Sequence, residues 1–198
     1  MAETLKLLVP SWDQLYSLLT DLARSILAHY RPEVIIGVAR GGLIPARIAA
    51  DLLDVPTIGI IGVAFYEDVG RRMRRPIITQ PLCVSVEKKR VLVIDDIADT
   101  GESLALVVSE VRGRAEELRT ATIYRKLWAR FIPDFSARET DAWVVFPWEL
   151  RETIERIGRR LLDSGKTLQE VGNGLALAGI DRRQVLAVLE DLCGEPSP

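Results

Sequence analysis

The stretch best suited to chemistry joins two adjacent carboxylates to a short turn rich in hydroxyls. It reads Val91-Leu92-Val93-Ile94-Asp95-Asp96-Ile97-Ala98-Asp99-Thr100-Gly101-Glu102-Ser103. The apolar run predicts a buried strand that ends at Asp95 and Asp96, at the edge of the sheet where α/β proteins bind ligands. The turn then opens a predicted helix, whose free N–H groups and dipole suit an anion. The carboxylates could bind ribose hydroxyls and the turn could bind a phosphate. Together they indicate a sugar-phosphate site.

The alternative interpretation of this stretch is a strand followed by a capped helix, with the acids merely solvated. A third acid argues against it, because Asp99 follows Asp96 by three residues and directly precedes Thr100-Gly101. The order of these features favours ligand binding.

This segment resembles the signature of type I phosphoribosyltransferases, which bind phosphoribosyl pyrophosphate (PRPP). The resemblance implies that Asp95 and Asp96 hold the ribose hydroxyls, directly or through a Mg²⁺ ion bound partly through water. It also implies a 5′-phosphate loop made of Ala98, Asp99, Thr100, Gly101, Glu102 and Ser103. Asp99 matches the catalytic residue that accepts or holds a purine proton near N7. Mg²⁺ is the expected cofactor, because it prefers oxygen ligands, water and substrate phosphates.

A second turn follows the first predicted strand, at Val38-Ala39-Arg40-Gly41-Gly42-Leu43. Its glycines allow close backbone approach, and Arg40 supplies a charge-assisted donor. The turn resembles the family's pyrophosphate loop, which assigns Arg40 and Gly41 to that group. A glycine-rich turn with an exposed arginine is the alternative.

A third set of residues resembles the purine pocket of the xanthine-guanine phosphoribosyltransferases and their archaeal-type relatives. The resemblance implies that Lys126 donates to purine O6, that Trp143 stacks on the ring, and that Val144 and Glu149 lie near the 2-position. Lysine has donors only, so it suits an oxo group and not the amino group of adenine. In the alternative, Trp143 belongs to a strand core and Lys126 is a surface charge.

The segment from Phe65 to Pro81 breaks the periodic pattern and is expected to form a solvated loop. Tyr66 falls where related enzymes carry a lid tyrosine, and it is the candidate lid residue. The arginines between 71 and 75 could screen pyrophosphate, and for each one a solvated surface position is the alternative.

Strands alternate with helices along residues 11–150, which predicts an α/β fold with a mainly parallel, twisted sheet flanked by helices. Strands are expected at 34–38, 57–63, 91–94, 120–124 and 142–146, with helices at 11–31, 42–53 and 101–111. After Pro147 three helical patterns follow, at 149–162, 167–177 and 181–192. The expected domains are a phosphoribosyltransferase domain at 1–150 and a helical extension at 151–198.

Composition places limits on function. The 198 residues carry a formal net charge of −2, so bulk charge gives no support for nucleic-acid binding. Two distant cysteines indicate neither a disulfide framework nor a metal cluster. The chain shows neither a signal peptide nor a membrane span, so a cytoplasmic protein is expected.

These features together predict an enzyme that transfers the phosphoribosyl group of PRPP to N9 of a 6-oxopurine, with a purine nucleotide and pyrophosphate as products. Other bases are the alternative within the enzyme class. A PRPP- or nucleotide-binding transcriptional regulator, with the C-terminal helices as a small module for that role, is the alternative outside that class. The other interpretation of these helices, which the balance of their charges favours, is a packing or dimerisation appendage. The resemblance also implies a homo-oligomer, expected to be a dimer.

Overall fold

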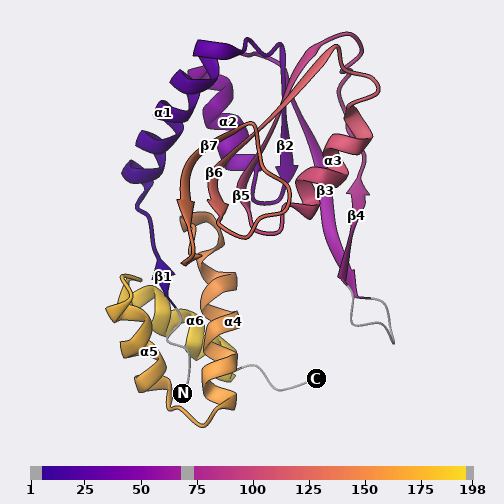
Figure 1. Cartoon of the computed structure of the whole chain (residues 1–198). Coiled ribbons are helices and arrows are strands. Elements are labelled where there is room, and N and C mark those ends of the chain that lie inside the picture. Colours follow the sequence, from indigo (N-terminus) through magenta and orange to yellow (C-terminus); the bar gives the residue numbers. More distant parts are fainter. Residues whose placement is uncertain (1–5, 68–73, 195–198) are drawn as a thin grey trace. The chain divides into compact units, whose positions relative to one another are not determined.

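The computed structural model describes residues 6–67 and 74–194 (Figure 1). The chain forms two compact units. One spans Asp13–Asp141, and the other combines the segment before Asp13 with the chain from Ala142 onward.

The first unit is built on a six-stranded sheet with the order β4-β3-β2-β5-β6-β7. Its strands are β2 (Val34–Ala39), β3 (Ile58–Glu67), β4 (Arg74–Gln80), β5 (Arg90–Ala98), β6 (Glu117–Lys126) and β7 (Phe135–Thr140). Neighbouring strands are parallel except for β3 and β4. The prediction of an α/β fold with a mainly parallel sheet is confirmed.

Helices cover both faces of this sheet, as near-continuous apolar strands require. They are α1 (Trp12–His29), α2 (Leu43–Leu52) and α3 (Glu102–Val111). On one face, Ile36 and Val93 share a buried cluster with Leu104 and Val107 of α3. On the other face, Gly37 lies so close to Ala46 of α2 that a Cβ there would come within 2.9 Å of the Ala46 Cβ. Successive strand residues therefore serve opposite faces.

The prediction of a loop from Phe65 to Pro81 is wrong for most of that segment. β3 continues to Glu67 and pairs antiparallel with β4, with Phe65 opposite Pro76 and Tyr66 opposite Arg75. β4 is an edge strand of the sheet, where a proline costs no ladder hydrogen bond when its nitrogen faces outward. A charged residue in β4, such as Arg75, is typical of a protected sheet edge.

Two strand boundaries also differ from the prediction. β5 does not end at Asp95 and Asp96 but continues to Ala98, because its pairing with β6 runs on to Ala98 opposite Arg125. Tertiary pairing here overrides the low strand propensity of aspartate. The sequence pattern also missed β7, whose residues are half-buried or exposed and lack an apolar run.

The second unit has a short parallel pair, β1 (Leu7–Leu8) with β8 (Trp143–Val144), followed by the 3-10 helix η1 (Pro147–Glu149). The strand predicted at 142–146 is therefore reduced to two residues. The helices α4 (Leu150–Asp163), α5 (Leu168–Leu177) and α6 (Arg182–Gly194) confirm the three helical patterns. Their apolar faces share a core that includes Ile154, Val171 and Val185.

The Tyr30 hydroxyl donates to carbonyl groups of two neighbouring strands, β5 and β6. Replacing Tyr30 tests how much this hydroxyl contributes to stability. Its hydroxyl lies 3.0 Å from the Val91 carbonyl and 3.1 Å from the Glu117 carbonyl, and its burial raises the pKa of the phenol. Tyr30→Phe removes the donor, so we expect the free energy of unfolding in urea to fall by about 1–3 kcal/mol. The matched control is Tyr16→Phe, because Tyr16 is 51% exposed. Equal stability of both variants would contradict a role for the Tyr30 hydroxyl.

Candidate active site

Asp95 and Asp96 lie near the carboxyl end of β5, and both are almost buried, with 9% and 6% exposure. The Asp96 N–H donates to Oδ1 of Asp95 over 2.9 Å. Because neighbours on a strand leave on opposite faces, the Asp96 side chain shares the α2 side with Ile94. Asp95 and Asp96, which we call the acidic floor, are thus nearly buried at the carboxyl edge of the sheet, rather than two solvated acids after a strand.

The turn between β2 and α2 crosses directly over this floor. A Cβ at Gly41 would lie 2.6 Å from Cγ of Asp96, and one at Gly42 would lie 2.5 Å from the Ile94 carbonyl oxygen. No larger side chain fits at either position without movement of the backbone or of the carboxylate. Arg40 is exposed in the same turn, and the Ala39–Arg40 peptide bond is cis. The structure therefore brings the Arg40-Gly41 turn and the acidic pair together.

The segment from Ala98 to Ser103 connects β5 to α3. Gly101 has φ +82°, which favours glycine, and a Cβ there would lie 2.6 Å from the Phe131 Cβ. The Glu102 N–H is 3.3 Å from the Thr100 hydroxyl oxygen. The positive end of the ten-residue helix α3 follows, so this turn offers N–H groups and hydroxyls suited to a phosphate.

Lys126 ends β6, the strand next to β5, and is only 6% exposed. Burial lowers the pKa of its ammonium, while the negative charges of Asp99 and Asp141 oppose that shift. A desolvated ammonium beside two carboxylates is a strong donor to a ligand carbonyl oxygen. Lys126 is therefore no ordinary surface charge.

Trp128 contacts two of the candidate site residues and was not predicted from the sequence. Its indole N–H donates to Oδ1 of Asp99 over 2.9 Å, and the Lys126 Nζ lies 5.0 Å from the centre of its ring. The sequence does contain a signal, since an aromatic residue two positions after a strand-terminal lysine falls at the same edge of the sheet as the acidic motif.

Trp143, Val144 and Glu149 belong to the second unit. Trp143 is 38% exposed, and the Arg156 guanidinium lies 5.6 Å from its ring centre. The N–H groups of Trp143 and Val145 donate to the carbonyls of Lys6, just before β1, and of Leu8 in β1, each over 2.8 Å. Because the ladder alternates, the N–H and C=O of Val144 point away from β1. β8 thus presents a backbone donor and acceptor beside an exposed indole.

Trp148 and Glu149, at the end of this segment, have different surroundings. Trp148 stacks on Phe146 with ring centres 4.8 Å apart, so it serves packing. Glu149 ends η1 and is half-buried.

Tyr66, the candidate lid residue, lies near the end of β3 with 59% exposure. Of the arginines assigned to the same lid, Arg71 and Arg72 fall outside the described residues. Arg75 lies opposite Tyr66 on β4 and is exposed.

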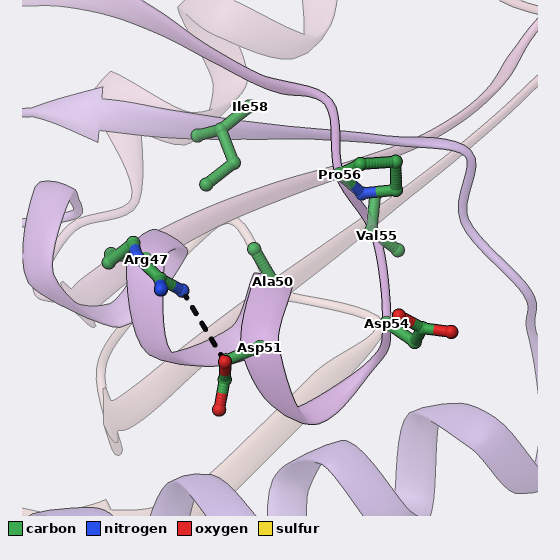
Figure 2. Close-up of a pocket in the computed structure, with 7 residues that line it drawn as sticks. All are labelled: Arg47, Ala50, Asp51, Asp54, Val55, Pro56 and Ile58. Carbon is green, nitrogen blue, oxygen red and sulfur yellow. Dashed lines mark ion pairs between the residues drawn. The ribbon is translucent and has the colours of Figure 1, made fainter.

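A surface hollow of about 350 Å³ lies elsewhere on the first unit (Figure 2). It is lined by Arg47, Ala50, Asp51, Asp54, Val55, Pro56 and Ile58. Ile58 begins β3, so this hollow lies at the amino edge of the parallel strands, away from the acidic floor. Arg47 and Asp51 form an ion pair of 3.8 Å within this hollow. None of the predicted site residues lines the hollow.

Within residues 6–67 and 74–194, no three His, Cys, Asp or Glu side chains gather closely enough to hold a metal by themselves. In the same part of the chain, every helix is too short or too polar to span a membrane.

Comparison with known proteins agrees with this geometry. The phosphoribosyl transferase domain family matches residues 11–154. The xanthine-guanine phosphoribosyltransferase of Nitratidesulfovibrio vulgaris is 31% identical over 70% of this chain and 82% of its own length. The protein with the same description from Idiomarina loihiensis is 29% identical over 71% of this chain and 85% of its own.

Solved structures give the same result. The purine phosphoribosyltransferase of Pyrococcus horikoshii aligns with a TM-score of 0.65 and 38% identity, over 73% of this chain and 94% of that one. The xanthine-guanine-hypoxanthine enzyme of Helicobacter pylori, at 20% identity and a TM-score of 0.65, shares the fold. With a family match over most of its length and these relatives, the chain belongs to the phosphoribosyltransferase family, in the branch of the purine enzymes.

Proposed function

We propose that this protein transfers the 5-phosphoribosyl group of PRPP to N9 of a 6-oxopurine (guanine, xanthine or hypoxanthine) and releases pyrophosphate, as a purine salvage enzyme. One observation carries the proposal. Within a single unit, the Gly41 turn, the acidic floor, the Thr100–Ser103 turn and the buried Lys126 ammonium all lie at or just after the carboxyl ends of adjacent strands. Parallel sheets bind ligands at this edge.

Each group of PRPP is assigned to residues of this site. Asp95 and Asp96 offer carboxylate oxygens to the ribose hydroxyls, and the turn of Ala98, Asp99, Thr100, Gly101, Glu102 and Ser103 offers N–H groups and hydroxyls to the 5′-phosphate. Arg40 and the Gly41 backbone are assigned to pyrophosphate, where an arginine neutralises charge on the leaving group.

Mg²⁺ fits the same site. Two nearly buried carboxylates give oxygen ligands, and their small number suits an ion that keeps water and substrate phosphates in its shell. Asp95 and Asp96 would hold the ion, partly through water. When bound, Mg²⁺ supplies positive charge that stabilises the departing pyrophosphate.

The reaction breaks the bond between C1′ and the pyrophosphate oxygen, whose electron pair leaves with pyrophosphate, and forms the N9–C1′ bond. As N9 becomes bonded, the purine must lose the proton on N7. Asp99 is assigned to accept or hold that proton. Its exposed carboxylate is held on one oxygen by Trp128, which leaves the other oxygen available.

The purine is assigned to residues that recognise its ring and edges. Lys126 donates to O6, and the exposed face of Trp143 stacks on the ring. The outward N–H and C=O of Val144, with Glu149, are assigned to the 2-position. Tyr66 remains the proposed lid residue, and a homodimer remains the proposed assembly, to be tested by sedimentation.

The substrate panel is the direct test of this proposal. The pure protein is incubated with PRPP and Mg²⁺ and with guanine, hypoxanthine, xanthine, adenine, uracil or orotate in turn. We expect nucleotide formation with 6-oxopurines alone, because Lys126 provides donors only. Tight binding of PRPP or nucleotide without product from any base would support the regulator instead, and DNA retardation by the protein would then be the next measurement.

Gly41→Ala tests the approach of the turn to Asp96. The added Cβ overlaps the carboxylate, so we expect the KM for PRPP to rise by about tenfold or more, equivalent to at least ~1.4 kcal/mol of binding. Gly113→Ala is the matched control, since a Cβ at Gly113 meets no atom within 4 Å. Unchanged kinetics in Gly41→Ala would place pyrophosphate elsewhere.

Lys126→Met separates recognition from stability. Burial lowers the pKa of Lys126 below its ordinary 10.5, so the folded protein loses this proton at lower pH than the unfolded chain does. The buried charge therefore costs stability at neutral pH, and the cost fades as pH rises through the folded pKa toward 10.5.

We accordingly expect Lys126→Met to lose 6-oxopurine turnover while its free energy of unfolding at pH 7 equals or exceeds that of the wild type. Any gain should shrink in the alkaline range below pH 10.5. Denaturant unfolding at a series of pH values measures this. Lower PRPP affinity with intact purine affinity would instead assign Lys126 to the PRPP site.

A further inference from the structure

We infer that Trp128 is a positioning residue for the reaction: its indole fixes the orientation of the Asp99 carboxylate and the place of the Lys126 ammonium at the same time. The inference rests on the proposed function, because it gives Trp128 a role through these two residues and not through contact with substrate.

The first contact is the hydrogen bond from the indole N–H to Oδ1 of Asp99, 2.9 Å long. Indole nitrogen is a donor only, so it can bond a carboxylate oxygen but cannot exchange roles with it. With one oxygen committed, rotation of the carboxylate is restricted and the other oxygen keeps a defined direction. A proton acceptor gains from such a fixed direction, because proton transfer depends on the geometry of the donor and acceptor.

The second contact is with Lys126, whose Nζ lies 5.0 Å from the centre of the indole ring. An ammonium at this distance is attracted by the ring's electron density, more strongly when it is desolvated. Lys126 is only 6% exposed. The same ring thus holds the proposed O6 donor with its face and the proposed proton acceptor with its edge.

The backbone that carries Trp128 is itself anchored to the phosphate turn. The N–H groups of Arg130 and Phe131 lie 3.0 and 3.3 Å from the Thr100 carbonyl. The end of this segment is fixed by Asp134, whose carboxylate accepts from the Thr120 N–H at 2.8 Å and from its hydroxyl at 2.7 Å. Although the indole is 53% exposed, the backbone that follows it is therefore anchored at two points.

Two substitutions separate the contacts. Trp128→Phe keeps a ring beneath Lys126 and removes the N–H, whereas Trp128→Leu removes both. We expect Trp128→Phe to lower kcat by about tenfold, the factor for one hydrogen bond to a charged group, with both KM values within about twofold of the wild type. Trp128→Leu should in addition raise the KM for the purine. Trp12→Phe is the matched control, because Trp12 is 52% exposed and has no assigned role.

A double-mutant cycle shows whether Trp128 acts through Asp99. In an Asp99→Asn background, Trp128→Phe should change kcat by less than about twofold, since the residue that it positions has already lost its function. An equal loss in both backgrounds, or wild-type kcat in Trp128→Phe, would overturn the inference.

A spectroscopic measurement tests the contact without turnover. The chain has four tryptophans, so ¹⁵N-labelled protein gives four indole N–H signals, and Trp128→Phe identifies one of them. Asp99→Asn should shift that signal far more than the other three, and an unmoved signal would overturn the inference. Absence of nucleotide formation by the wild type would instead count against the proposed function alone.

Discussion

The proposed active site depends on how closely the backbone of Gly41 approaches the carboxylate of Asp96. A nearly buried carboxylate is costly unless its surroundings and its ligands compensate. The glycine turn covers this carboxylate without a side chain, which leaves the acidic floor accessible to a substrate and to an oxygen-preferring cation. The position of the turn follows from the parallel register of β2 and β5, which pairs Gly37 with Ile94 just before both motifs.

The same edge of the sheet concentrates charge that the apolar core cannot tolerate. Asp95 and Asp96 on β5 and Lys126 on β6 are each less than 10% exposed, in strands whose other buried residues are mostly apolar. Such groups reduce stability in the absence of substrate and are compensated by substrate, metal or each other. Trp128 belongs to this arrangement, because it contacts one charged residue with its edge and another with its face.

Much of the fold and of the candidate site could be predicted from the sequence. Apolar runs and turn residues were enough for the α/β order, the helices and the two glycine turns, because those signals are local. Long-range pairing was not predictable: it extends β5 past Asp96, joins β4 to β3 across a charged segment and reduces residues 142–146 to a two-residue strand beside β1. The role of Trp128 could not be predicted for a similar reason, since its partner Asp99 is 29 residues away in sequence.

The most direct test of the site is a crystal structure with guanosine monophosphate and Mg²⁺. We expect the ribose hydroxyls at Asp95 and Asp96, directly or through Mg²⁺, and the phosphate against the turn from Thr100 to Ser103. We also expect purine O6 within hydrogen-bonding distance of the Lys126 ammonium. A nucleotide bound away from the acidic floor, or bound there with its base turned from Lys126, would contradict the proposed site.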